Sequence, residues 1–129
     1  MRRVPPLARP TGRLRFIFVA LLLPPMLLAA CTNAPVVLGQ PPAGSPGAIG
    51  ALAQAAPKSQ VVVSGTMIEK CPVAGCWFVL RDGTGQVRVD TKAAGFVVTE
   101  VPLKTKVTVV GSVNREEGLT SVSALGARY

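Results

Sequence analysis

The sequence predicts an all-β protein, a small five-stranded barrel preceded by a signal peptide and a disordered linker. Three observations lead to this prediction. Residues 61–129 alternate runs rich in valine and threonine with clusters of Gly, Pro and Asp, the pattern of strands joined by turns. Residues 31–60 are rich in Ala, Pro and Gly and show no sustained strand or helix periodicity. Residues 1–30 carry five arginines and a short apolar run, the layout of an export signal.

The signal peptide ends at Cys31. Its apolar run, Phe16–Leu28, is shorter than the about 20 residues that a membrane-spanning helix needs, and Pro24-Pro25 interrupts it. The sequence Leu28-Ala29-Ala30-Cys31 resembles the lipobox of bacterial lipoproteins. This resemblance implies cleavage before Cys31, a diacylglycerol thioether on its sulfur and an acyl chain such as palmitate on the new amino terminus. A retained transmembrane helix and cleavage by the ordinary secretory peptidase remain alternatives.

An acylated Cys31 makes the membrane the first expected partner of the chain. Thr32 follows the cysteine where an Asp acts, in enteric bacteria, as a signal for retention in the inner membrane. We therefore expect a protein of the bacterial cell envelope, lipid-anchored in the outer membrane and facing the periplasm rather than held at the inner membrane.

The charge of the exported part is modest. Nine of the 14 Lys and Arg residues and all six Asp and Glu residues lie after residue 30, so the net charge there is about +3 instead of +8. A value this small does not argue for nucleic acid as a ligand.

Residues 31–60 are expected to form the acylated terminus and a flexible linker. They contain too few large apolar residues to drive folding. A flexible chain of this length has a root-mean-square end-to-end distance on the order of 30 Å. A short helix over residues 48–56 agrees with their Ala and Leu content but is marginal in isolation. Deleting Pro41–Ala56 is therefore expected to leave the melting temperature of the domain unchanged within about 2 °C.

The folded domain is expected over residues 61–129 as five strands. In the first strand, Gly65 stands where a strand bends. The second and third strands form a hairpin through the Asp82-Gly83 turn, and Val87 and Val89 alternate with polar neighbours. A longer connection at residues 91–103 precedes the fourth strand. The five expected strands are Gln60–Ile68, Cys76–Arg81, Gln86–Asp90, Lys106–Val113 and Leu119–Leu125.

This layout resembles an OB-fold barrel, and specific motifs extend the resemblance. The segments Val63–Gly65, Phe78–Val89 and Pro102–Gly111 are similar to the V-x-G strand, the F-x-L-x-D-x-x-G hairpin and the P-x-x-x-x-V-x-V-x-G strand of exported bacterial OB-fold domains. The segment Cys71–Trp77 resembles a group of uncharacterised bacterial OB-fold domains with a Cys-x₄-Cys-Trp loop. The resemblance implies an OB-fold for the whole folded part and leaves its function open.

Cys71 and Cys76 form the chemically reactive pair of the domain. Pro72 and Gly75 can bend the loop between them, and an exported protein is in an oxidising compartment, so a structural disulfide is the first prediction. Copper(I) binding is the alternative, with Met67 as a third sulfur ligand, and redox exchange is another. Zinc is not expected, because the chain has no histidine and Cys31 is assigned to lipid.

The ligand face of an OB-fold usually lies on its second and third strands. If Phe78 and Leu80 fill the barrel, Trp77 and Arg81 lie outside, with Arg88 on the paired strand. Trp77, Arg81 and Arg88 are therefore candidate ligand-binding residues, suited to a stacked ring and an anionic group. In the cell envelope a saccharide, a peptide or a protein partner is expected rather than nucleic acid.

No catalytic pattern is found in the sequence. It has no histidine, no nucleophile elbow and no glycine-rich phosphate loop. We expect a non-catalytic binding or interaction domain without a cofactor, and a copper(I)-binding or redox-active thiol protein as the alternative.

Overall fold

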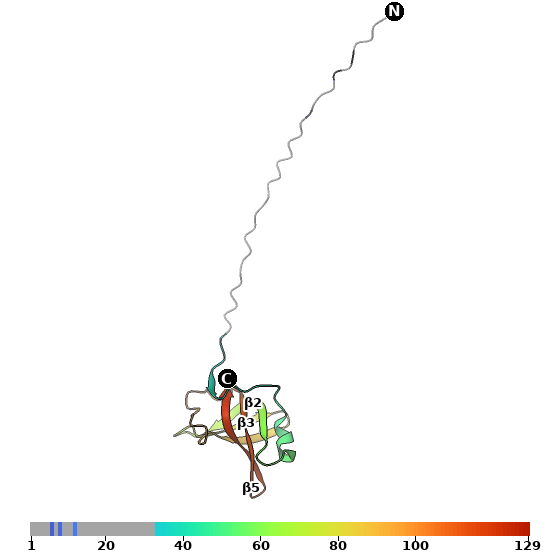
Figure 1. The fold of residues 1–129 in the computed structure, drawn as a ribbon. Coiled ribbons are helices and arrows are strands. Elements are labelled where there is room, and N and C mark those ends of the chain that lie inside the picture. The colour runs from blue at the N-terminus through green and yellow to red at the C-terminus, as the bar shows by residue number, and fades with distance from the viewer. Residues whose placement is uncertain (1–5, 7, 9–11, 13–32) are drawn as a thin grey trace, which may run out of the picture. The chain divides into compact units, whose positions relative to one another are not determined.

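Six strands and one short 3₁₀ helix follow one another in the computed structural model, which describes residues 6, 8, 12 and 33–129 (Figure 1). Asn33–Tyr129 forms one compact unit that contains every buried hydrophobic residue described, so it should fold without the residues before it. The elements are β1 (Val37–Gly39), η1 (Ile49–Gln54), β2 (Gln60–Lys70), β3 (Trp77–Asp82), β4 (Gly85–Asp90), β5 (Lys106–Glu116) and β6 (Leu119–Arg128).

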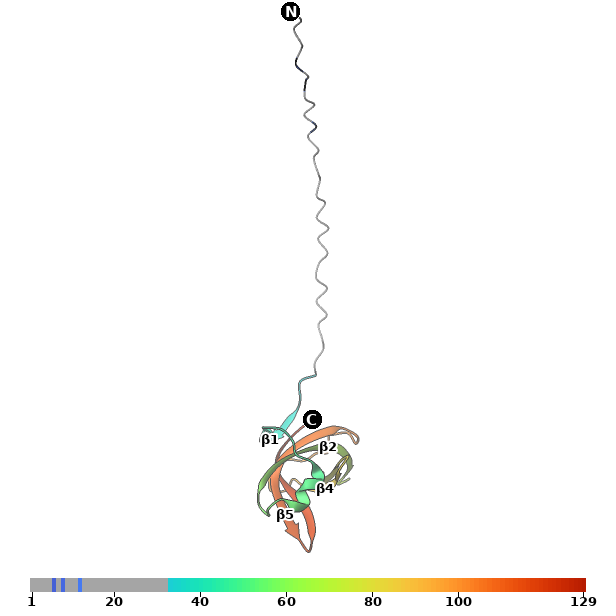
Figure 2. The ribbon, with the colours of Figure 1, turned by 90° about the vertical axis from the view of Figure 1, so that its right-hand side faces the viewer.

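Strands β2 to β6 close into a five-stranded barrel (Figure 2). The sheet order is β1-β6-β4-β3-β2-β5, and β5 pairs again with β6 to complete the ring. All pairings between these strands are antiparallel except β4 with β6, which run parallel at residues 88–90 and 121–123. The prediction of an all-β, five-stranded barrel is therefore confirmed.

Strand β2 bends so that it can belong to both halves of the barrel. Its first part pairs with β5 and its last part with β3, and Thr66 has a partner on each side. Gly65 lies at this bend because a Cβ there would come within 2.7 Å of the carbonyl oxygen of Arg81. The prediction that Gly65 lies at a bend of this strand is therefore confirmed.

The barrel interior contains the side chains that the alternation places there. Phe78 and Leu80 are fully buried, and Val87 and Val89 face the core from the paired strand. Met67 is also fully buried in this hydrophobic cluster. A methionine packed in the core is poorly placed to serve as a copper ligand beside two half-exposed cysteines, so this part of the alternative metal site is corrected.

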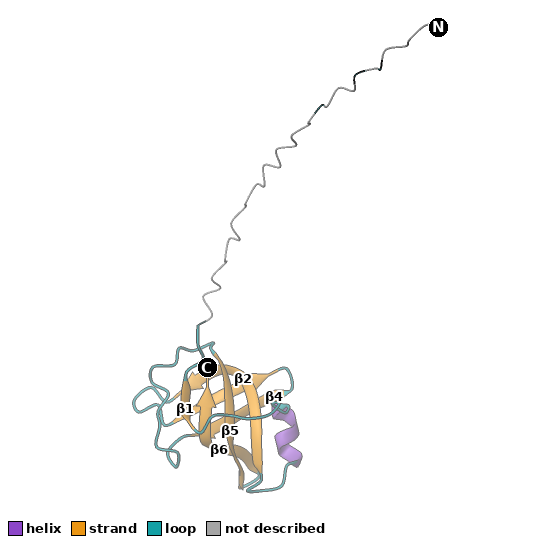
Figure 3. Cartoon of the chain, turned by 45° about the horizontal axis from the view of Figure 1, so that its top comes forward, coloured by secondary structure: helices purple, strands orange, loops and turns teal. Residues whose placement is uncertain are grey.

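The expected flexible linker differs from the structure, because residues from about 36 onward pack on the barrel (Figure 3). Ile49 and Leu52 of η1 are buried in the core cluster, and Arg115 on β5 donates hydrogen bonds to backbone carbonyls at the end of this helix. At the other end, β1 pairs with β6. This packing needs only a few apolar residues in the segment itself, because the barrel strands supply the rest of the hydrophobic surroundings. The folded domain therefore begins near residue 36 and not at residue 61.

The predicted signal peptide and Cys31 lie outside the described residues. Within the described part of the chain, no helix has both the length and the apolar character needed to cross a membrane.

Candidate functional site

Trp77 and Arg88 meet on the outer surface of the β3–β4 hairpin. The guanidinium carbon of Arg88 lies 4.5 Å from the centre of the Trp77 ring, a cation–π arrangement. Trp77 is paired with Asp90 across the hairpin and is half-buried, whereas Arg88 is exposed. The stacking holds the arginine in place and leaves an aromatic and a charged surface side by side.

A groove of about 830 Å³ continues from Arg88. It lies between β4 and the end of the β5–β6 hairpin, and the parallel pairing of Arg88 with Ser121 joins its two sides. Its lining is acidic, because it contains three carboxylates and only one guanidinium. The lining residues are Arg88, Asp90, Glu116, Glu117, Leu119, Thr120 and Ser121.

The acidic side of this groove was not predicted from the sequence. The fourth strand was expected to stop at Val113, but β5 continues to Glu116 and the chain turns within Glu117-Gly118. Both turn residues have positive φ, 51° and 80°, as a tight two-residue hairpin requires. Gly118 was the available signal: with the turn centred on it, the strands extend and carry the two glutamates to the groove.

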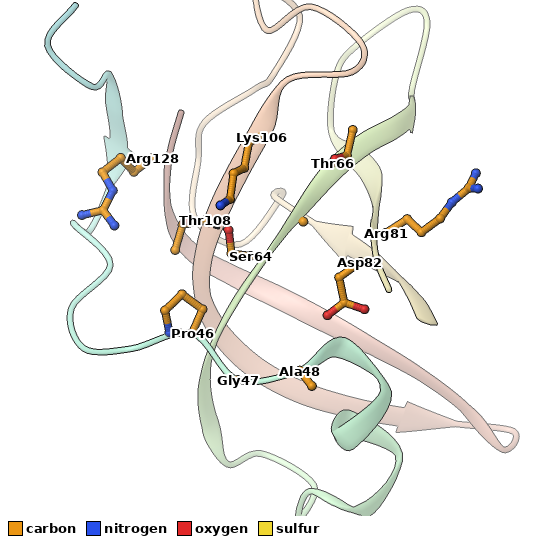
Figure 4. A pocket seen from close by; sticks show the side chains of 11 residues that line it. Pro46, Gly47, Ala48, Ser64, Thr66, Arg81, Asp82, Lys106, Thr108 and Arg128 are labelled. Carbon is orange, nitrogen blue, oxygen red and sulfur yellow. Dashed lines mark hydrogen bonds between the residues drawn. The ribbon is translucent and has the colours of Figure 1, made fainter. Parts of the chain in front are cut away.

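Arg81 belongs to a different site from Trp77 and Arg88. It lines a second pocket, of about 750 Å³, on the outer face of β2, β3, β5 and β6 (Figure 4). Lys106 and Arg128 are the other cations of this pocket, and residues 46–48 form one of its sides. The structure therefore brings together two of the three predicted ligand residues and separates the third.

Asp82 closes one side of this second pocket and has a structural role. Its carboxylate accepts hydrogen bonds from the backbone N–H groups of Ile49, Thr84 and Gly85 and from the Thr84 hydroxyl, at 2.6–3.1 Å. These donors lower the pKa of Asp82 to about 2. Asp82 thereby joins η1 to the β3–β4 turn, in addition to the turn role that its sequence position suggested.

Cys71 and Cys76 are free, half-buried thiols, so the predicted disulfide is absent from this structure. The loop between them is held by backbone hydrogen bonds, from Cys71 to the Trp77 carbonyl (2.9 Å) and from Gly75 to the Cys71 carbonyl (3.3 Å). Hydrogen bonds from backbone N–H groups, first that of Ala74 and then that of Val73, lower the pKa of Cys71 to about 7. These bonds favour the thiolate form of the Cys71 sulfur.

A metal site with more ligands is not found in the described residues, where no group of three or more His, Cys, Asp or Glu side chains could hold an ion.

The barrel topology, with a groove beside the third barrel strand and the last hairpin, defines an OB-fold protein. Residues 39–125 match the family model described as bacterial OB fold (BOF) protein, and the chain belongs to this family. The match begins within β1, in agreement with the early start of the domain.

The solved structures that are similar to the chain include the following two. The hypothetical protein ygiW from E. coli has 19% sequence identity and a TM-score of 0.50, over 64% of this chain and 87% of that one. A chain of the S. pombe Stn1-ten1 complex has 19% identity and a TM-score of 0.46, over 63% of this chain and 76% of its own length. No curated protein matches the chain significantly. The likeness to ygiW supports the fold alone.

Proposed function

We propose that this protein is an envelope lipoprotein, anchored through acylated Cys31, whose OB-fold domain is a non-catalytic binding module. Its binding site would be the groove beside Trp77 and Arg88. The observation that carries the proposal is that Arg88, which lines a groove of about 830 Å³, is stacked on the ring of Trp77. This volume lies within the range of small-ligand sites, and OB-folds commonly bind ligands on this part of the barrel.

The charge of the groove indicates the class of ligand. Asp90, Glu116 and Glu117 outnumber Arg88, whose guanidinium already lies over the Trp77 ring. A polypeptide segment with basic side chains complements these carboxylates, and exposed Leu119 adds an apolar contact. A neutral saccharide stacking on Trp77 is the second ligand class. Phosphate-rich nucleic acid is disfavoured by the same carboxylates.

The non-catalytic assignment is supported by the roles of the reactive groups. The chain has no histidine, and the carboxylate of Asp82 is occupied by four hydrogen bonds from the backbone and Thr84. The carboxylates of the groove line an open surface beside hydroxyl groups. Such a surface suits recognition better than proton transfer, which needs a sheltered acid or base.

The fluorescence of Trp77, the one tryptophan of the chain, provides the test of binding. A short peptide of alternating alanine and lysine is titrated into fragment 33–129, and cello-oligosaccharide serves as the neutral probe. The change Glu116→Gln with Glu117→Gln should weaken peptide binding by about three-fold per removed charge. The matched pair Glu69→Gln with Glu100→Gln, outside the groove, should leave it unchanged. The proposed site would be contradicted if both double variants lost the same peptide affinity, or if neither the peptide nor the oligosaccharide changed the Trp77 fluorescence.

A second candidate function rests on the free thiols: copper(I) binding or redox exchange at Cys71 and Cys76. Two thiols close together, one with its pKa lowered to about 7, suit a soft metal ion. In metal-free protein isolated from the envelope, iodoacetamide should label both cysteines, Cys71 faster, and copper(I) should protect both. Two sulfurs that resist alkylation until a reductant is added would contradict the thiol assignment and restore the disulfide.

A further inference from the structure

The second pocket has an arrangement of cations and hydroxyls that the proposed function does not use. Antiparallel pairing sets six outward side chains in two rows across β3, β2, β5 and β6. Residues paired directly across strands project on the same face of a sheet, so these side chains share one surface. One row is Arg81, Thr66 and Lys106, and the other is Ser64, Thr108 and Arg128.

Lys106 lies beside the hydroxyl groups of the pocket. Figure 4 shows its side chain reaching toward Ser64 and Thr108, with Arg128 and Arg81 on opposite sides. The Thr108 and Ser64 hydroxyls are joined at 3.1 Å, which fixes their positions. An ammonium group and two ordered hydroxyls thus converge, and a guanidinium stands at either edge.

The acid of this pocket does not compete for the cations. Both carboxylate oxygens of Asp82 are directed to the β3–β4 turn and to η1, as their four hydrogen bonds show. Three positive charges therefore face one carboxylate that is already satisfied. The pocket attracts an anion, in contrast to the acidic groove beside Arg88.

The backbone makes the pocket accessible. Gly47 lines one wall and is held there by the hydrogen bond that its N–H donates to the Val62 carbonyl at 2.8 Å. The resulting volume of about 750 Å³ admits an anionic group together with part of the molecule that carries it.

We propose that this pocket is a binding site for a phosphate group. A phosphate offers several acceptor oxygens, which matches the Lys106 ammonium, the two hydroxyls beside it and the guanidinium groups at the edges better than a single carboxylate does. The phosphate could belong to a soluble phosphate ester or to a phospholipid headgroup.

The position of β1 makes a headgroup accessible. Val37 is paired with Arg128, and only five residues lie between Cys31 and Val37. Fully extended, that segment spans at most about 21 Å. If Cys31 is acylated, the pocket thus stays within reach of the membrane surface. Only the lipid source depends on the proposed anchor; phosphate binding by the pocket does not.

Fragment 33–129 tests the site without the anchor. Inorganic phosphate and glycerol 3-phosphate are titrated against chloride at equal ionic strength, and the amide signals of Ser64, Thr66 and Thr108 are followed by NMR. Co-sedimentation with vesicles of phosphatidylcholine, with and without phosphatidylglycerol, tests the headgroup. We expect the phosphate compounds to shift these amide signals, or the fragment to bind the phosphatidylglycerol vesicles, or both.

Charge-matched variants make the test specific. Lys106→Gln with Arg128→Gln should weaken binding about five-fold per removed cation, on the order of 30-fold for the pair. Lys58→Gln with Lys92→Gln removes the same charge outside the pocket and should have little effect. If the paired change perturbs folding, Lys106→Gln alone is used.

The source of the phosphate follows from which probe the pocket variant binds more weakly than the unchanged fragment. Weaker binding of the soluble phosphate compounds alone indicates a soluble ligand, and weaker binding of the vesicles alone indicates the headgroup. The proposal is overturned if chloride produces the same shifts, if the control pair loses as much affinity as the pocket pair, or if neither probe binds. Because no arm uses acylated protein, failure of the lipid anchor would leave these results unaffected.

Discussion

Leu52→Ala should lower the free energy of unfolding of fragment 33–129 by about 2–3 kcal/mol, the lower part of the range for buried leucines. Leu52 is 4% exposed and lies in the core cluster with Ile49, so truncation leaves a cavity between η1 and the barrel. In a domain of this size, the loss should move the melting temperature down by about 10–20 °C. Chemical denaturation followed by circular dichroism measures it.

Leu119→Ala is the matched control, since it removes the same atoms from a leucine that is 74% exposed. Its effect on stability should stay within about 0.5 kcal/mol. A Leu52→Ala variant as stable as this control would mean that residues 36–60 do form the flexible linker that their composition suggests.

Cys31→Ser should abolish membrane anchoring of the mature protein. If Leu28-Ala29-Ala30-Cys31 is the proposed lipoprotein signal, loss of the sulfur removes the site of the diacylglycerol thioether and prevents processing of the signal. The variant should either retain its signal peptide or lose its acyl chains, so fractionation and intact-mass analysis must be done together. The effect is all-or-none, because non-covalent contacts of the domain alone are far weaker than two or three acyl chains.

Cys71→Ser is the matched control for this change. It removes a cysteine of the loop before β3 and should leave processing, mass increment from acylation and membrane fractionation as in the wild type. A Cys31→Ser protein that is cleaved, acylated and sedimented like the wild type would refute the anchor.

The elements predicted from sequence are those with local determinants. The β3–β4 hairpin follows from the alternation around Val87 and Val89 and from the Asp-Gly turn signal, although Asp82 pairs with Gly85 and the turn itself is at residues 83 and 84. The bend of β2 follows from Gly65. In contrast, β1 and η1 gain their stability from β6 and the barrel core, far away in sequence. Composition near Ile49 and Leu52 resembles a linker because the rest of their hydrophobic surroundings comes from other strands.

The candidate site was predictable only in part, for a geometrical reason. Strand alternation correctly places Trp77, Arg81 and Arg88 outside the barrel, but it contains no information about curvature. Strand β3 twists and coils with the closed sheet, so its two ends face different surfaces. Trp77 therefore stacks with Arg88, while Arg81 joins Thr66 and Lys106 across the bend of β2. The state of the Cys71 sulfur depends on the backbone amides around it, which spacing alone does not specify.

The pairing of β1 with β6 has a consequence for the connectivity of the domain. Val36 and Tyr129 exchange two backbone hydrogen bonds, of 2.8 and 3.0 Å, so the place where the chain enters the barrel adjoins the place where Tyr129 lies. Domains in which the two ends of the fold lie close together tolerate circular permutation. A circular permutant joined between these ends and opened at Glu117-Gly118 would keep every strand pairing of the barrel, and the same adjacency would let the domain be inserted as a cassette into a surface loop of another protein.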